Sequence, residues 1–478
     1  MGMRRRGPRQ DSLWVAHSDI AEAPGHRFYK HLDALLTKGS FDRKVEELCA
    51  PHYEREGTPG RPSIPPSIYF RMLLVGYFEG IESERGICWR CADSLSLREF
   101  LGLSLTDDVA SHSTLSRIRS RLPAHVYSDV FRLVLEMVNR AGLLKGKVAG
   151  IDATYLRADA SMKSIVRRDT KEGYADYLTR LTKESGVAEP TAEDGRRLDR
   201  KRRKKTSNRE WASPTDPDAR IGRLKDGRTR LAYKAENIVD MDTSAIVAAE
   251  IHPADEADTA TLPSTLDLAE DNVEAANASS RKDSDDEPDP PGAGTDSGTD
   301  GFTEIVADKG YHKADLIRRL RDTGYRTYIP EPRIYGKRHW TDKGGLETAR
   351  AIYQNRARTQ RRKSRRLQRK RGELLERPFA HLCETGAFRR VRLRGRVNVA
   401  KRYVIQAAAW NLGLILRNQI GWGTPRGLAE GLRRRTRAPG RPWPVSVLSR
   451  ARIKTLFDYA MIIPTCGERG LAGVVIAA

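Results

Sequence analysis

The sequence predicts an α/β protein, in which a mixed sheet flanked by helices follows an all-helical, helix-turn-helix-like N-terminal domain. Three observations lead to this fold class. Apolar residues recur at helical spacing over 28–143. Three short apolar runs then follow one another as strands between 147 and 252. After 303, short strands alternate with helices, a pattern typical of a sheet covered by helices.

The N-terminal domain is expected at 28–143 and is predicted to be built almost entirely of helices. Pro123 separates its last two helices, and Gly142 follows the final one as a plausible C-cap. The 478-residue chain has room for about three such domains. Helices are expected at 67–78, 85–92, 96–101, from 111 or 113 to 123, and 124–140.

The second domain is expected at 144–425 and carries the sheet. Its strands are predicted from β-branched and apolar runs, and its helices from longer periodic segments. The expected strands are 147–156, 229–240, 244–252, 303–308 and 325–329, and the expected helices lie within 256–277 and at 312–322, 350–377 and 402–417.

Four segments fall outside this pattern because they are polar or strongly charged. Residues 1–27 are predicted to form a flexible basic arm, and 157–227 a polar insertion with a basic block at 200–205. The acidic segment 279–300 has almost no apolar residues, so we expect a disordered loop. Residues 426–478 form a basic C-terminal tail of no predictable structure.

The charge of the chain points to a polyanionic partner. Lysine and arginine number 86 against 63 acidic residues, which gives a net charge of +23. Such a surface attracts nucleic acid and gains affinity by releasing counterions, so double-stranded DNA is the first partner to test. No run of about 20 apolar residues predicts a membrane span. With no apolar signal segment and only five cysteines, a reducing cytoplasm is the expected location.

Two predicted strands carry an acid at or near their C-terminal end, Asp152 and Asp308. A carboxylate on an apolar strand is unfavourable unless it is paired or binds a cation. Adjacent strands would bring the two acids to one sheet edge, where oxygen ligands favour Mg²⁺ or Mn²⁺. Alternatively, each acid simply caps a strand or begins a turn.

The third acid of such a site is expected near the end of the basic helix. Glu373 and Glu376 are the candidates, and both follow a dense run of arginines. Either one could equally form a surface ion pair. Glu376 lies among apolar residues, which favours a fixed position, whereas Glu373 adjoins Gly372 and the arginines.

Two basic segments are predicted to contact DNA. The first is a short helix that resembles the recognition helix of a helix-turn-helix. The second is the basic helix itself, whose arginines would hold phosphates beside the acids; a solvated basic face is the alternative for both. The predicted contacts are Ser113, Arg117, Arg119 and Arg121 in the first, and Arg361, Arg362, Arg365, Arg366 and Arg369 in the second.

Several motifs, taken in order, resemble the DDE transposases of bacterial insertion sequences. None is decisive alone, but together they extend over roughly 28–425. In the N-terminal domain they are GRPSIPP at 60–66 and YFEGIESERG at 77–86; in the second domain they are GIDAT at 150–154, ADKGY at 307–311, ERPFAHLCETG at 376–386 and KRYVIQAAAWNLG at 401–413.

The resemblance implies a ribonuclease H-like catalytic core, with the triad Asp152, Asp308 and Glu376 binding two Mg²⁺ or Mn²⁺ ions. Many relatives carry a Tyr, an Arg and a Lys around the glutamate, whereas this chain has Arg369, Gly372 and Cys383 there. Glu373 therefore stays open as the third acid.

The implied activity is that of a bacterial, nucleoid-associated transposase. It would bind the terminal inverted repeats, then cut DNA and join it to a target. Both element ends must be paired, so a homodimer or higher oligomer is expected. Two alternatives stay open: an inactive DNA-binding remnant acting as a regulator, and a ribonuclease H-like nuclease without strand transfer.

Overall fold

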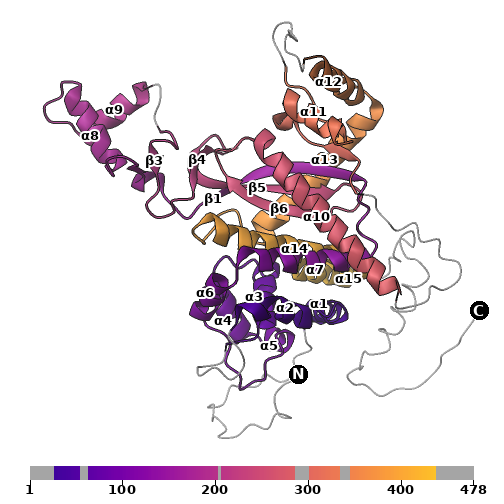
Figure 1. The fold of residues 1–478 in the computed structure, drawn as a ribbon. Helices are drawn as coiled ribbons and strands as arrows, with labels where there is room; N and C mark the ends of the chain where they lie inside the picture. The colour runs from indigo at the N-terminus through magenta and orange to yellow at the C-terminus, as the bar shows by residue number, and fades with distance from the viewer. Residues whose placement is uncertain are drawn as a thin grey trace, which may run out of the picture.

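A computed structural model shows a helical N-terminal region beneath a mixed sheet, with a long helix between them (Figure 1). This arrangement confirms the predicted α/β class with a helical N-terminal domain. The described residues are 26–53, 63–202, 206–224, 226–285, 301–333 and 345–437.

The N-terminal helices surround α3, which is buried on nearly every side. A helix that is apolar all round belongs in a core, and α3 begins with proline at its first position, where no amide hydrogen is needed. Its buried Arg71 pairs with Asp33 and Asp42 and so holds the first two helices. The helices are α1 (Arg27–Lys38), α2 (Phe41–Cys49), α3 (Pro66–Phe78), α4 (Glu84–Asp93), α5 (Leu95–Phe100), α6 (His112–Arg121) and α7 (Ala124–Arg140).

The sheet has the strand order β4-β5-β1-β7-β8, with β6 also paired to β5. Strand β1 is antiparallel to β5 and parallel to β7, so the sheet is mixed, as predicted. The five predicted strands are all present, and each begins and ends within two residues of its expected limits. They are β1 (Val148–Arg157), β5 (Thr229–Asp240), β6 (Ile246–Pro253), β7 (Glu304–Val306) and β8 (Arg326–Tyr328), joined by the short β4 (Arg220–Arg223).

Helix α14 connects the two parts of the molecule, because it packs on both α7 and β6. Asn411 donates to the carbonyl of Ile246 and accepts from its amide, while Trp410 donates to the carbonyl of Ser244. The helices of this part are α10 (Asp258–Asp285), α11 (Ala314–Asp322), α12 (Gly345–Thr359), α13 (Arg362–Ala380), α14 (Arg396–Ile420) and α15 (Pro425–Arg437).

Two expectations about these helices were wrong in detail. The single basic helix predicted at 350–377 is two helices, because Arg361 has an extended backbone and caps α13. The acidic loop was predicted to begin at residue 279, but α10 continues to Asp285. Residues 286–300 of that loop lie outside the described residues.

The polar insertion between β1 and β5 is folded and projects from the sheet (Figure 1). Its small core is Trp211, which packs edge-on against Tyr174 and Tyr177. The elements are η3 (Met162–Ser164), β2 (Val166–Arg167), α8 (Tyr174–Glu184), α9 (Ala192–Lys201) and β3 (Trp211–Ala212). Residues 203–205 of the basic block are outside the described part.

The predicted terminal segments are mostly outside the described residues. Of the basic arm, 1–25 are not described, and α1 begins at Arg27. Of the C-terminal tail, α15 reaches Arg437, and 438–478 are not described. Within the described ranges, no helix combines the length and the apolar character that a bilayer crossing needs.

Candidate functional site

The parallel pairing of β1 and β7 brings Asp152 and Asp308 level with each other. Val148 pairs with Glu304 and Gly150 with Val306, and Asp152 and Asp308 each lie two residues beyond this last pair, toward the same edge of the sheet. Asp308 follows β7 and caps the short helix η4 (Lys309–Tyr311). Its Oδ1 accepts a hydrogen bond of 2.8 Å from the amide of Gly310, which fixes that carboxylate at the sheet edge.

Asp152 is held on the sheet face that α13 covers. Its Oδ1 accepts from the amide of Ala153 at 2.9 Å, and its Oδ2 lies 3.4 Å from Nη1 of Arg371. The side chain is 19% exposed, so its charge is partly removed from water. A cation on α13 therefore compensates the carboxylate.

Helix α13 lies close against the sheet, because a glycine on β1 leaves room for it and a glutamine on α13 forms hydrogen bonds to the sheet backbone. A Cβ on Gly150 would stand 3.2 Å from the side chain of the buried Leu375, so glycine allows this approach. Gln368 donates through Nε2 to the carbonyls of Ala307 and Tyr328, at 3.1 and 2.7 Å. These contacts attach α13 to the ends of β7 and β8, beside Asp308.

The two candidates for the third acid lie on the solvent side of α13. Both Glu373 and Glu376 are exposed, and Glu373 forms an ion pair of 2.7 Å with Arg377. Glu376 follows the buried Leu375 but is not gathered with Asp152 and Asp308. Across the described ranges, no three His, Cys, Asp or Glu side chains are grouped in a way that could hold a metal ion.

A further carboxylate, Asp258, stands beside Asp308. A Cβ on Gly310 would meet Oδ1 of Asp308 at 2.9 Å and Oδ2 of Asp258 at 3.0 Å, so both groups approach the same backbone point. Lys234 donates to Asp258 across 3.2 Å. Asp258 begins α10, and an acid in the first turn of a helix is common, so the sequence did not single it out. The one signal for the Lys234–Asp258 pair was a lysine on the otherwise buried strand β5.

Behind Asp258 lies a buried polar network centred on Glu236. Its carboxylate is fully buried and accepts from Tyr311, Thr261 and Thr265. Burial raises the pKa of Glu236, and burial together with Glu236 raises the pKa of Tyr311. The network fixes η4, and with it Asp308, against α10.

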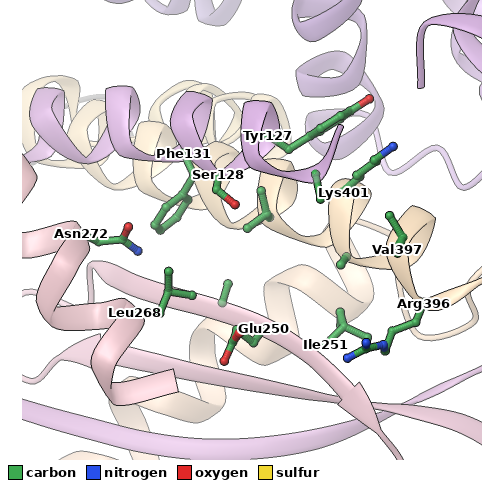
Figure 2. A pocket seen from close by; sticks show the side chains of 14 residues that line it. Tyr127, Ser128, Phe131, Glu250, Ile251, Leu268, Asn272, Arg396, Val397 and Lys401 are labelled. Atoms are coloured by element: carbon green, nitrogen blue, oxygen red, sulfur yellow. The ribbon is translucent and has the colours of Figure 1, made fainter. Parts of the chain in front are cut away.

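Asp152 is partly exposed and Glu373 and Glu376 are exposed. A cavity of about 270 Å³ is found elsewhere, between α7, β6, α10 and α14 (Figure 2). Glu250, Asn272 and Arg396 supply its polar groups, and none of the predicted acids lines it. Small-molecule sites are usually concave, so the open edge at Asp152 and Asp308 suits an extended substrate better.

Helix α6, the predicted recognition helix, offers fewer DNA contacts than its sequence suggests. Arg117 is exposed, and the exposed Arg121 stacks on Tyr53 at 4.8 Å. Ser113 is partly exposed and bonds the capping Ser111. Arg119, however, is only 13% exposed and forms an ion pair with Glu84. The DNA contact of Arg119 stays a prediction, and Arg119 would have to exchange its ion pair with Glu84 for a phosphate to make it.

The arginines of α13 form a continuous basic stripe. With about 3.6 residues per turn, their positions fall on the helix side away from the sheet, in line with Glu373 and Glu376. All are exposed, and no ion pair with a described carboxylate engages them. The cations on the other side, Lys363 and Arg371, pair with Glu304 and Asp152. The stripe consists of Arg361, Arg362, Arg365, Arg366 and Arg369.

Comparison with protein families identifies both parts of the chain. A family described as "Transposase domain (DUF772)" matches residues 18–121, and one described as "Transposase DDE domain" matches residues 218–412. The second match includes Asp308 and Glu376, whereas Asp152 precedes it. Searches among curated proteins and among solved structures gave no match. With a transposase domain over its helices followed by a DDE domain over its sheet, the chain belongs to the DDE transposases of insertion sequences.

Proposed function

We propose that this transposase binds the terminal inverted repeats of its insertion sequence and catalyses metal-dependent cleavage and strand transfer of DNA. The observation that carries the proposal is the parallel pairing of β1 with β7, with Asp152 on β1 and Asp308 two residues after β7. The order of the core strands, with β1 central and acids on β1 and after β7, agrees with the ribonuclease H-like core that the family resemblance implies.

The donor set supports a hard divalent cation, because every candidate ligand is a carboxylate oxygen. Asp152 and Asp308 would hold Mg²⁺ or Mn²⁺, with Glu376 proposed as the third ligand. When bound, the ions would supply an activated water or 3′-hydroxyl and stabilise the leaving oxygen. The chain itself positions the ligands: Arg371 keeps Asp152 on the α13 face, and the Gly310 amide orients Asp308.

The basic surfaces would hold the substrate next to these acids. The arginine stripe of α13 lies in line with Glu373 and Glu376, so phosphates bound there would lead toward these two candidates for the third acid. Arg117, Arg121 and Ser113 of α6 would contact the inverted repeats. We expect a dimer or higher oligomer, because two element ends must be joined, and we expect the enzyme to act on the bacterial nucleoid in the cytoplasm.

The decisive experiment supplies a plasmid carrying both element ends, with and without a target plasmid, in the presence of Mg²⁺. Wild type should cut at the ends and join them to the target, whereas Asp152→Asn and Asp308→Asn should bind DNA without cutting. If wild type bound DNA without cutting it, the chain would be an inactive DNA-binding regulator. The Arg371–Asp152 ion pair is compatible with that alternative, because it neutralises Asp152 without a metal. Cleavage without joining would favour a nuclease.

A further inference from the structure

A second cavity, of about 170 Å³, lies where the helical domain meets the catalytic domain. One side is the turn 82–84, which leads into α4. The other side is the segment 386–393, which precedes α14, and the floor is formed by Arg402 and Gln406 of α14. None of the proposed metal ligands lines this cavity.

Arg402 is a buried cation with no carboxylate bound to it. It is 7% exposed, and its one recorded hydrogen bond runs from Nη2 to the carbonyl of Ile81, at 3.4 Å. Its buried Nη1 has no hydrogen-bond acceptor within the described parts of the chain. A buried charge without a partner is strongly unfavourable, so this guanidinium calls for an anion.

The neighbouring polar groups do not provide that anion. Glu84 acts on Arg402 through its charge but forms its ion pair with Arg119, and Glu82 accepts from Arg392 at 2.8 Å. Both carboxylates of the cavity wall are therefore already matched by other arginines. Arg390 adds another cation at the half-exposed rim: its Nη2 donates to Asp159 at 3.2 Å, while its buried Nε has no acceptor among the described residues.

Gln406 contributes an acceptor next to these donors. Its Nε2 donates to the carbonyl of Gly386 at 2.8 Å, which orients the amide. Its Oε1 is buried and has no described donor. A water bound beside an anion would satisfy this oxygen, as buried waters commonly do for otherwise unpaired polar groups.

We infer that this cavity binds a phosphate group, with Arg402 at its base and Arg390 at its rim. A guanidinium matches phosphate with parallel hydrogen bonds, which a halide ion cannot reproduce. Pockets for drug-sized ligands are usually 300 Å³ or more, so a cavity of this size suits a phosphate and a few waters rather than a whole nucleotide.

The most direct source is a phosphodiester of the DNA that α6 would bind, and this part of the inference rests on the proposed function. Lys401, next to Arg402, donates to the carbonyl of Arg119 on α6 at 2.8 Å. Arg390 adjoins the end of β1, because the backbone amide of Arg157 donates to the carbonyl of Arg389. A phosphate here would bind arginines whose neighbours in the chain contact α6 and the end of β1.

The first test uses inorganic phosphate and the full-length protein. The melting temperature of wild type should rise by several degrees in phosphate relative to sodium chloride of equal ionic strength, because a ligand that binds the native state stabilises it. Arg402→Met should lose this rise. The variant is expected to fold, since replacing a buried charge with an apolar side chain is often tolerated.

A variant of the rim residue Arg390 and a control variant of Arg394, outside the cavity, keep the test decisive even if Arg402→Met fails to fold. Arg390→Gln should reduce the phosphate-dependent rise, whereas Arg394→Gln should retain it. Both arginines pair with Asp159, but only Arg390 lines the cavity. Equal rises in Arg390→Gln, Arg394→Gln and wild type, or no rise in wild type beyond the chloride control, would overturn the site.

The second test identifies the source of the phosphate. If a DNA phosphodiester occupies the cavity, inorganic phosphate should weaken binding of element-end DNA more than chloride does, and Arg402→Met should bind that DNA about tenfold more weakly. Stabilisation by phosphate without such competition would assign the site to free phosphate and exclude the DNA source. Asp152→Asn should keep the phosphate response, so a failure of the catalytic proposal would be seen separately.

Discussion

Arg371 on α13 reaches across to Asp152 on β1, with Nη1 and Oδ2 3.4 Å apart and both side chains less than one-fifth exposed. The guanidinium occupies the side of the carboxylate that faces α13. A divalent cation bound by Asp152 would have to compete with this charge. If Asp152 is a metal ligand, as proposed, the affinity for metal would depend on Arg371 even though Arg371 need not touch the metal.

We predict that Arg371→Gln lowers the Mn²⁺ concentration needed for half-maximal cleavage. The same change should lower the free energy of unfolding without metal by about 1–3 kcal/mol, because Asp152 loses its charged partner. Titrating cleavage against Mn²⁺ and unfolding the apoprotein with urea measure both effects. Lys370→Gln, which breaks the more exposed pair with Asp242, is the control. If Arg371→Gln instead needed more Mn²⁺ for half-maximal cleavage, Arg371 would stabilise the metal-bound form of the site.

We predict that Glu376→Gln abolishes cleavage while Glu373→Gln leaves it nearly unchanged. Glu376 sits directly after the buried Leu375, whereas Glu373 is engaged in an exposed pair with Arg377 that contributes little. Cleavage rates under single-turnover conditions, with DNA binding measured alongside, separate the two. If only Glu373→Gln were inactive, the third ligand would move to Glu373.

The arginine stripe of α13 should set the salt dependence of DNA binding. Replacing Arg365 and Arg369 together by Gln should reduce the log–log slope of affinity against salt by about two, or roughly 0.9 for each lost phosphate contact. Fluorescence anisotropy between 50 and 200 mM salt would measure it. Arg350→Gln on α12 is the matched control, because Arg350 already pairs with Glu347. An unchanged slope would remove α13 from the interface.

His252 should make the protein less stable in mild acid. Burial, together with Lys234 and Arg396, lowers the pKa of His252 to about 4, so the native state keeps it neutral. The unfolded chain takes up a proton near pH 6.5, and stability therefore falls as the pH drops from about 6.5 to about 4, by up to about 3 kcal/mol. Urea unfolding across this range gives the slope.

His252→Gln should remove that part of the slope while keeping a hydrogen bond to Thr265. The comparison with the variant is needed because burial raises the pKa of Glu236 and Glu250 nearby. Raised carboxyl pKa values act in the opposite sense: their stabilising effect is lost as the pH rises through them. A variant as acid-sensitive as wild type would show that another group dominates.

The strands were predictable because their signal is local. Runs such as 229–240 and 244–252 are rich in β-branched and apolar residues and are separated by a turn, and β5 and β6 begin and end close to those limits. The prediction that the strands before Asp308 and around Asp152 are neighbours is confirmed by the pairing of β1 with β7. The direction and register of β1 and β7 supplied the rest.

Other features depend on contacts that no local pattern records. Arg119 looks like any exposed arginine in the sequence, but Glu84 from α4 pairs with its side chain, and Lys401, 282 residues away, binds its backbone. The fold of the polar insertion depends on the packing of Trp211 against two tyrosines. Similarly, Glu373 and Glu376 face outward because the opposite side of α13 packs against the sheet.

The pairing of β1 with β7 also has a consequence for biosynthesis. Val148 meets Glu304, 156 positions later in the chain, and helix α7 of the N-terminal part packs on α10 and on α14, which is made later still. At about 5–20 residues per second, a ribosome would need roughly 8–30 seconds to pass from one strand to the other. Neither the pairing of these two strands nor the packing of α7 can therefore be complete until those later residues have been made.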